Sequence, residues 1–177
     1  MLKLSSWPDW MLYLRNPTPA TTTNRVRPVR FPATNRTLIA LGVFVDSNIL
    51  LYAASGRAGD VLKAVRARRL LQEEKVVISF QVLQEFYANA VHPRKPALSA
   101  PQAAAYCSAW LGFAIVPLGA ATFVRALELV TRYRISNWDA AILAAALESG
   151  CELIYSEDLN AGQDYGGVHV VNPFREP

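Results

Sequence analysis

Four acidic residues stand where a folded chain could bring them together to do chemistry. Asp46 directly follows a short apolar, β-branched run, and Asp158 closes another such run. Glu85 lies within one helical pattern, and Asp139 falls in the first turn of another. Carboxylates that converge without a neighbouring base repel one another, and a divalent cation removes this repulsion. Because Mg²⁺ and Mn²⁺ prefer hard oxygen ligands, the set predicts a Mg²⁺ or Mn²⁺ site, with Asp46, Asp139 and Asp158 as metal ligands.

Such a site is typical of phosphodiester hydrolysis. A bound metal ion polarises a phosphoryl oxygen, lowers the pKa of a bound water and stabilises the leaving oxygen. Two ions about 4 Å apart would divide these tasks. The sequence shows no arrangement of Ser or Cys typical of a nucleophile, so water is the expected attacker. The two histidines, His92 and His169, are expected to have structural or surface roles.

Each acid also has a simpler interpretation when it is considered alone. Asp46 could cap the helix that follows it, and Asp139 could complete a Ser-x-x-acid cap. Asp158 could be a turn residue, and Glu85 could be an ordinary residue on a helix surface. The combination favours a shared site, because residues 140–147 are apolar on nearly every face of a helix and should be buried. A carboxylate at the buried start of that helix needs a partner.

Between residues 42 and 171, short apolar runs alternate with helical patterns. The expected strands are Gly42–Val45, Val76–Ile78, Ala114–Val116, Glu152–Tyr155 and Val168–Val171. The expected helices are Asn48–Ala54, Asp60–Glu74, Phe80–Val91, Ala100–Leu111, Ala120–Tyr133 and Trp138–Leu147. This alternation indicates an α/β fold with a parallel sheet covered on both faces. Because ligands bind such sheets at the carboxyl ends of the strands, Asp46 and Asp158 should lie at the same edge.

The composition is that of a folded protein of ordinary domain size. Of the 177 residues, 52% are hydrophobic and 18% are charged, which argues against a largely disordered chain. Two cysteines are too few for a disulfide framework, and we expect Cys107 and Cys151 to be small buried apolar residues. The sequence has no apolar run of membrane-spanning length and no secretory signal, so we expect a cytoplasmic protein without membrane contact.

The net charge of +4 belongs to the front of the chain. Residues 1–40 hold six basic residues and one acid, a net of +5, whereas the remaining 137 residues hold 12 basic and 13 acidic residues, a net of −1. We expect residues 1–40 to be a disordered Pro- and Arg-rich extension, and residues 41–177 to form the nuclease domain. The extension could also contact RNA through residues 25–36, or lie upstream of the true translation start.

Four segments of the chain resemble the motifs of PIN domains, and specifically those of the VapC ribonuclease toxins of type II toxin–antitoxin pairs. They are Val43–Tyr52, Ser79–Phe86, Trp138–Ile142 and Ser156–Leu159, the last followed by Tyr165–Val168 and Val171–Phe174. The resemblance implies a three-layer α/β/α fold with a central, mostly parallel five-stranded sheet.

By motif position, the same resemblance implies roles for individual residues. The acidic set would be Asp46, Glu85, Asp139 and Asp158. Asn48 and Ser156 would support these acids through hydrogen bonds, with Ser156 standing where Thr is more usual. Glu157 is adjacent to Asp158 and could replace it as the last acidic ligand.

The resemblance further implies an Mg²⁺- or Mn²⁺-dependent endoribonuclease toxin that forms homodimers and is inhibited by a cognate antitoxin. A partner helix lying in an apolar groove is the physical expectation for that antitoxin. A PIN nuclease of RNA processing and a non-catalytic RNA-binding module on the same fold are the alternatives. A dehalogenase-type phosphatase would need a second Asp where Asn48 stands, and a receiver domain would need paired acids and a late Lys.

RNA must also be held by basic residues. The candidates for phosphate contacts are Arg66, Arg69, Arg132 and Arg134, together with Lys63, Arg68, Arg94 and Lys95. Each could instead belong to a solvated helix face or loop. Phosphate contacts position a nucleic acid without selecting its sequence, so these residues do not identify the RNA.

Overall fold

The computed structural model describes residues 42–93 and 97–175. The predictions for residues 1–40 and for Arg94 and Lys95 lie outside these ranges. A five-stranded sheet forms the centre of the fold, and its order is β3-β2-β1-β4-β5, with every pairing parallel. The strands are β1 (Val43–Val45), β2 (Val76–Ser79), β3 (Ala114–Val116), β4 (Leu153–Tyr155) and β5 (His169–Val171). The predicted α/β class and the five parallel strands are confirmed.

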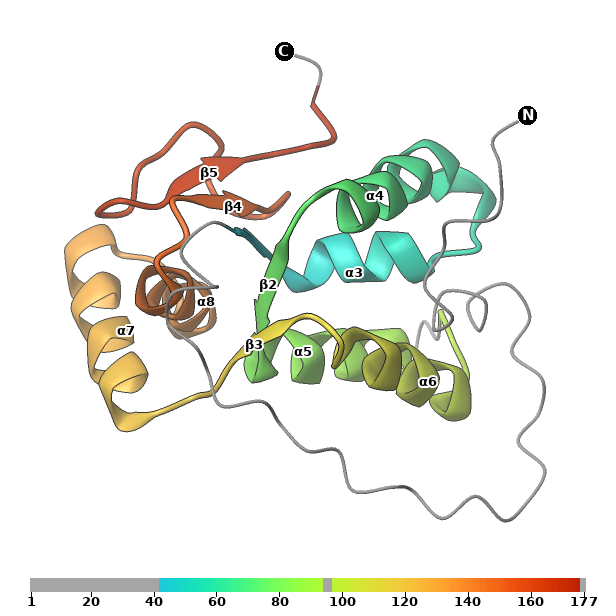
Figure 1. Ribbon diagram of the computed structural model, residues 1–177, viewed down its shortest axis with the longest axis horizontal. Helices are drawn as coiled ribbons and strands as arrows, with labels where there is room; N and C mark the ends of the chain where they lie inside the picture. Colours follow the sequence, from blue (N-terminus) through green and yellow to red (C-terminus); the bar gives the residue numbers. More distant parts are fainter. Residues whose placement is uncertain (1–41, 94–96, 176–177) are drawn as a thin grey trace.

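Helices cover both faces of the sheet and give three layers (Figure 1). Helices α7 (Ala120–Tyr133) and α8 (Asn137–Ser149) lie on one face. The other face carries α3 (Ser47–Ala54), α4 (Val61–Glu73), α5 (Phe80–Ala90) and α6 (Ala100–Trp110), with a short 3₁₀ turn, η2 (Ala58–Asp60), before α4. None of the helices within the described ranges is both long enough and apolar enough to cross a membrane.

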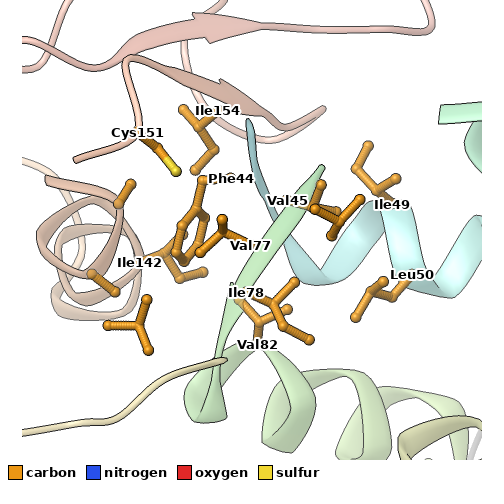
Figure 2. Packing of buried hydrophobic residues seen from close by; sticks show 14 of the residues in the cluster. Phe44, Val45, Ile49, Leu50, Val77, Ile78, Val82, Ile142, Cys151 and Ile154 are labelled. Carbon is orange, nitrogen blue, oxygen red and sulfur yellow. The ribbon is translucent and has the colours of Figure 1, made fainter. Parts of the chain in front are cut away.

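The core is built by the alternation of side chains along the strands. Phe44 of β1 points toward α8, where Ile142 lies, whereas the next residue, Val45, points toward α3 and Ile49 (Figure 2). Phe44, Val45 and Ile49 are fully buried, as period-two alternation in a sheet with two covered faces requires. Burial of a side chain of this size contributes about 1.5–3 kcal/mol. The two helical layers are therefore held to the sheet by opposite faces of the same short strand.

Helix α8 is a buried apolar helix whose first turn reaches the surface. Its central residues, from Ile142 to Ala146, are buried, but Trp138 is 65% exposed and Asp139 is half-exposed. Ser136 caps the helix by accepting a hydrogen bond from the Asp139 backbone N–H at 3.0 Å. We expected Asp139 to be buried at the start of this helix. That expectation is wrong, because the structure leaves Asp139 half-exposed.

Two helix ends use left-handed backbone. Gly150 (φ 74°) ends α8, where the missing side chain makes this conformation free of steric strain. Arg134 (φ 55°) ends α7 in the same conformation, and it is the one non-glycine residue with positive φ in the described part of the chain. Left-handed backbone costs a residue with a Cβ atom roughly 1–2 kcal/mol. The strained residue, Arg134, lies directly before the turn that leads to α8.

The two cysteines are free thiols. Cys151 is buried as predicted, whereas Cys107 is only half-buried on α6.

Candidate active site

The carboxyl ends of three neighbouring strands bring the polar residues of the site together. Asp46 follows β1, Ser79 ends β2, and Ser156 follows β4. Strand β1 lies between β2 and β4, so Asp46 stands at the middle of this edge. In open parallel sheets this edge is the usual place for a ligand.

Asp46 uses its two carboxylate oxygens for different purposes. Its Oδ1 accepts a hydrogen bond from the Ser47 backbone N–H at 2.5 Å, which caps α3. Its Oδ2 accepts from the Asn48 amide at 3.0 Å and from the Ser156 hydroxyl at 2.7 Å. Asp46 is buried, with 5% of its surface exposed. The capping interpretation of Asp46 is therefore confirmed, and its role in a reaction stays a prediction.

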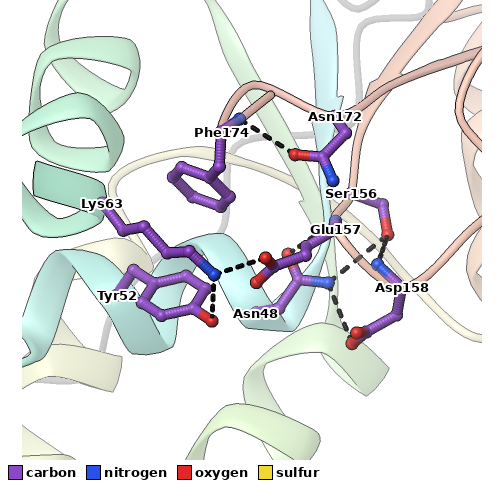
Figure 3. A network of polar contacts seen from close by, with 8 residues as sticks. All are labelled: Asn48, Tyr52, Lys63, Ser156, Glu157, Asp158, Asn172 and Phe174. Atoms are coloured by element: carbon purple, nitrogen blue, oxygen red, sulfur yellow. Dashed lines mark hydrogen bonds and ion pairs between the residues drawn. The ribbon is translucent and has the colours of Figure 1, made fainter. Parts of the chain in front are cut away.

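Asn48 and Ser156 connect Asp46 to Asp158 (Figure 3). The Asn48 amide nitrogen also lies 3.1 Å from Asp158 Oδ2, and the Asn48 amide oxygen accepts from the Glu157 N–H at 3.3 Å. The fully buried Ser156 hydroxyl accepts from the Asp158 N–H at 3.2 Å. Two carboxylates from distant parts of the chain thus share one amide group, as the predicted supporting roles require.

Glu85 and Asp139 come from helices rather than strand ends. Glu85 Oε2 accepts from the Ser47 hydroxyl at 3.1 Å, and Oε1 accepts from the Gln81 amide at 2.8 Å. The same Gln81 nitrogen lies 3.1 Å from the carbonyl oxygen of Trp138. Gln81 therefore links Glu85 to the first turn of α8, where Asp139 lies.

The acids influence one another electrostatically. Burial and, to a lesser degree, the charges of Glu85 and Asp158 raise the pKa of Asp46 from 3.8 to about 6, against the lowering effect of the hydrogen bonds from Ser156 and Ser47. With this pKa, Asp46 is mostly ionised near neutral pH and becomes protonated as the pH falls through about 6. A cation beside it would favour ionisation.

Glu157 faces a different partner from the neighbouring Asp158. Its carboxylate forms an ion pair with Lys63 of α4, and Figure 3 shows Glu157 directed toward Lys63 while Asp158 points away from it. Partial burial raises the pKa of Glu157, but hydrogen bonds from Lys63 and Tyr52 outweigh this effect and lower it overall. The charge of Glu157 is thus balanced within the fold, whereas Asp158 joins the network of Asp46.

A family model for the PIN domain matches residues 43–163, a span that contains all four acids and their hydrogen-bond partners. The chain belongs to the PIN-domain family. This confirms the family resemblance seen in the sequence motifs. No curated protein matches the chain significantly.

Three solved structures with a similar fold come from toxin–antitoxin systems. A toxin–antitoxin complex from Klebsiella pneumoniae is 23% identical, with a TM-score of 0.55, covering 76% of this chain and 99% of that chain. VapC20 from Mycobacterium tuberculosis, a sarcin–ricin loop cleaving toxin, is 23% identical with a TM-score of 0.55, covering 66% and 89%. VapBC2 from Rickettsia felis, bound to a DNA fragment from its promoter, is 17% identical with a TM-score of 0.52, covering 72% and 96%.

The donor set of this PIN domain fits a hard cation, although the acids are not yet gathered around one point. Carboxylate oxygens dominate the site, and the charges of Glu85 and Asp158 act on the buried Asp46, a repulsion that a cation would relieve. Within residues 42–93 and 97–175, no three His, Cys, Asp or Glu side chains already stand at metal-binding spacing. His169 lies 3.7 Å from Asp164 on the far strand, and it takes no part in the acidic network.

Several predicted RNA contacts have structural partners instead. Besides the pairing of Lys63 with Glu157, Arg68 donates to the carbonyl oxygens of Ala53 and Ser55 at 2.7 and 2.9 Å, which ties α4 to the end of α3. The remaining four candidates are exposed, and two of them have a local contact. These candidates are Arg66, Arg69 (2.8 Å from Glu73), Arg132 (its guanidinium 5.2 Å from the Tyr133 ring centroid) and Arg134. Their role in RNA binding stays a prediction.

Sequence reasoning missed Ser47, Gln81 and a pocket beside the acids. Gln81 stands four residues before Glu85, a spacing that places both side chains on one helix face, so this signal was available. The pocket has a volume of about 540 Å³, and both Asn48 and Asp158 line it. Its walls come from segments far apart in the sequence, so no local sequence motif predicts the pocket.

Proposed function

We propose that this PIN domain is a metal-dependent endoribonuclease and acts as the toxin of a type II toxin–antitoxin pair. The observation that carries the proposal is the convergence of Asp46 and Asp158 on the Asn48 amide, at the sheet edge where Glu85 and the start of α8 also meet. Such a density of carboxylates suits a divalent cation better than any other ligand.

Asp46, Asp139 and Asp158 would hold Mg²⁺ or Mn²⁺. When bound, the cation would polarise a phosphoryl oxygen of RNA and lower the pKa of a water molecule. Asn48 and Ser156 orient the Asp46 and Asp158 carboxylates through their hydrogen bonds. We assign Glu85 to accept the proton of the attacking water, because its carboxylate is half-exposed and solvent can reach it. Asp158 is preferred over Glu157 because Lys63 already balances the charge of Glu157.

The toxin role is supported by the fold shared with toxin–antitoxin proteins, since the chain covers nearly the whole length of those relatives. We therefore propose an antitoxin partner and a homodimer. Two helices carry strips of exposed apolar residues that offer surfaces for such partners. The strips are Val61, Leu62 and Val65 on α4, and Phe123, Val124 and Leu127 on α7.

The activity is tested by RNA cleavage with purified protein. Cleavage should require added Mg²⁺ or Mn²⁺, and Asp46→Asn or Asp139→Asn should lower kcat on the order of 1000-fold while circular dichroism stays unchanged. Asp164→Asn is the matched control, because Asp164 is an exposed acid outside the network and should retain full activity. Cleavage that persists in chelator, or in both variants, would overturn the metal-nuclease proposal.

The toxin role requires a test in cells. Expression should arrest growth, the Asp46→Asn variant should not, and a small gene beside this one should relieve the arrest. Metal-dependent cleavage without growth arrest would instead favour a PIN nuclease of RNA processing. RNA binding without any cleavage would favour the non-catalytic module.

A further inference from the structure

A recess that is partly open to solvent lies beside the acidic site. Its volume is about 540 Å³, which lies within the range of roughly 300–1,000 Å³ that is usual for small-molecule sites. Three parts of the chain form it: α3 with the turn after it, the carboxyl end of α5, and the loop after β4. Asn48 and Asp158 belong both to this pocket and to the acidic network. A ligand there would therefore touch the proposed reaction centre.

We propose that this pocket receives one unpaired base of the RNA substrate, next to the phosphate that is cleaved, and that it favours bases with an exocyclic amino group over uracil. The inference rests on the proposed ribonuclease function and extends it to substrate selection. Proteins that read RNA sequence act mostly on unpaired bases, which they stack on aromatic rings and bind through base edges.

The charges of the pocket favour a base over a phosphate. Three carboxylates line it, from Asp60, Glu157 and Asp158, and Lys63 balances the charge of Glu157. The other two carboxylates face one guanidinium, from Arg57, and the imidazole of His92. This balance repels a phosphate group but does not repel a neutral base. The lining also supplies an aromatic residue, Tyr52, which a base can use for stacking.

The walls are fixed by contacts with Lys63 and Phe174, which lie outside the pocket, and by a hydrogen bond between two lining residues. The Tyr52 ring packs against Phe174 with 4.9 Å between centroids, and the Lys63 ammonium lies 4.5 Å from its centre. Lys63 also pairs with Glu157 (Figure 3), and the Ser55 hydroxyl donates to Asp60 at 2.8 Å. Because these side chains are held before a ligand arrives, little ordering is needed when a base enters.

The preference for bases with an exocyclic amino group follows from the hydrogen-bond acceptors that line the pocket. A carboxylate offers about four lone-pair sites, so Asp60 and Glu157 retain acceptor capacity after their bonds to Ser55 and Lys63. Acidic side chains accept from the amino group of cytosine, and Asn binds adenine through both its donor and its acceptor. Asn89, exposed on α5, supplies such an amide to the pocket. Uracil has no amino group to donate.

The test uses single-stranded RNA oligonucleotides that share one cleavage site and vary at the nucleotides on either side of it. The wild-type protein should cleave oligonucleotides with uracil or an abasic site at one flanking position about 10-fold more slowly in kcat/KM than the preferred base. Asn89→Ala and Asp60→Asn should reduce this preference to less than about twofold. Gln84→Ala, an exposed change on the same helix outside the pocket, should keep the wild-type preference.

A second measurement separates this inference from the proposed function. Fluorescence anisotropy with the Asp139→Asn variant reports binding of the same oligonucleotides without cleavage. Absence of cleavage of every oligonucleotide in Mg²⁺ or Mn²⁺ would refute the ribonuclease, whereas base-dependent binding would still support the pocket. Equal rates and affinities for intact and abasic RNA at every position would overturn the pocket inference. So would Asn89→Ala and Asp60→Asn variants that weaken only the binding of an antitoxin.

Discussion

The acidic site has two halves that the fold holds in different ways. In the strand-end half, Asp46, Asn48, Ser156 and Asp158 bond to one another, and the first three are buried. In the helix-borne half, Glu85 and Asp139 are half-exposed, and the connection between their helices passes through the Gln81 amide. Several side-chain hydrogen bonds hold the strand-end half in place. The helix-borne half is held by single side-chain hydrogen bonds and by the backbone of its helices.

This difference indicates which half responds to a ligand. No three acids within the described ranges stand at metal-binding spacing, so the proposed binding of a cation by Asp46, Asp139 and Asp158 together would require some of them to move closer. Buried, fully bonded groups are costly to displace, whereas half-exposed side chains at a helix start change rotamer easily. We therefore expect the strand-end half to act as the fixed reference and the helix-borne half to adjust.

Removal of the Ser156 hydroxyl should break the strand-end half and have the largest effect on stability. Ser156→Ala removes one of the three hydrogen bonds to the buried Asp46 carboxylate and leaves the Asp158 and Leu159 N–H groups without their acceptor. The free energy of unfolding, measured by urea denaturation, should fall by about 2–4 kcal/mol. Ser149→Ala is the matched control, because the buried Ser149 hydroxyl donates one bond, to Ala146, and its loss should cost about 1 kcal/mol. Equal losses in both variants would contradict a cooperative network.

The pH dependence of stability should also separate the two halves. Because the pKa of Asp46 is raised from 3.8 to about 6 in the fold, its protonated form is stabilised, and this stability is complete below pH 3.8 and lost as pH rises through about 6. The difference corresponds to at most roughly 3 kcal/mol. Asp46→Asn should remove this loss in urea titrations between pH 4 and 7, and Asp139→Asn should keep it. A wild-type slope that persists in Asp46→Asn would show that another group is responsible.

Loss of the Gln81 amide should loosen the helix-borne half with a smaller effect. Gln81→Ala removes the bonds to Glu85 and to the Trp138 carbonyl, and it should cost about 1–2 kcal/mol of unfolding free energy. It should lower kcat about 10-fold and raise the Mg²⁺ concentration needed for half-maximal cleavage, with little change in KM for RNA. Gln84→Ala, one turn away and exposed, should change neither quantity. Unchanged metal dependence in Gln81→Ala would remove this residue from the site.

The smallest expected effect concerns the backbone that leads to Asp139. Arg134→Gly relieves the left-handed strain at the end of α7, which stabilises the folded state. Glycine also gives the unfolded chain more conformational freedom, which opposes part of this effect. The net free energy of unfolding should rise by about 0.5–1 kcal/mol. Arg132→Gly, within α7, should instead cost about 1 kcal/mol. If Arg134 also contacts RNA, the stabilised variant should show a raised KM in cleavage assays. A destabilised Arg134→Gly would mean that the Arg134 side chain makes contacts worth more than the strain.

The sequence predicted the strand-end half better than the helix-borne half, for a physical reason. Strand ends are visible as apolar runs, and parallel pairing sends all carboxyl ends to one edge, so the proximity of Asp46 and Asp158 followed from local patterns. The structure also shows helix caps at Ser79 and Ser136, a residue type that favours this position in the local sequence. The partial exposure of Asp139 was not predictable, because it depends on how far α8 extends beyond the sheet.

Contacts between distant helices could not be predicted. The sequence predicts that Lys63 lies on a solvent-exposed basic face of its helix. The packing of α4 against α3 instead brings Lys63 to Glu157, which is 94 residues away in the sequence. The pocket arises in the same way, from side chains that share no pattern along the chain.

The adjacency of β1 and β4 sets the order in which the site can assemble. Asn48 and Ser156 are separated by 108 residues, and Asp46 and Ser156 by 110. Proteins are synthesised from the N-terminus, and pairing between remote strands is slow to form. A ribosome that has translated the chain through α8 holds a product with Asp46, Glu85 and Asp139 but without the segment that completes the network. The network around Asp46 can therefore form only after β4 and the residues that follow it have emerged from the ribosome.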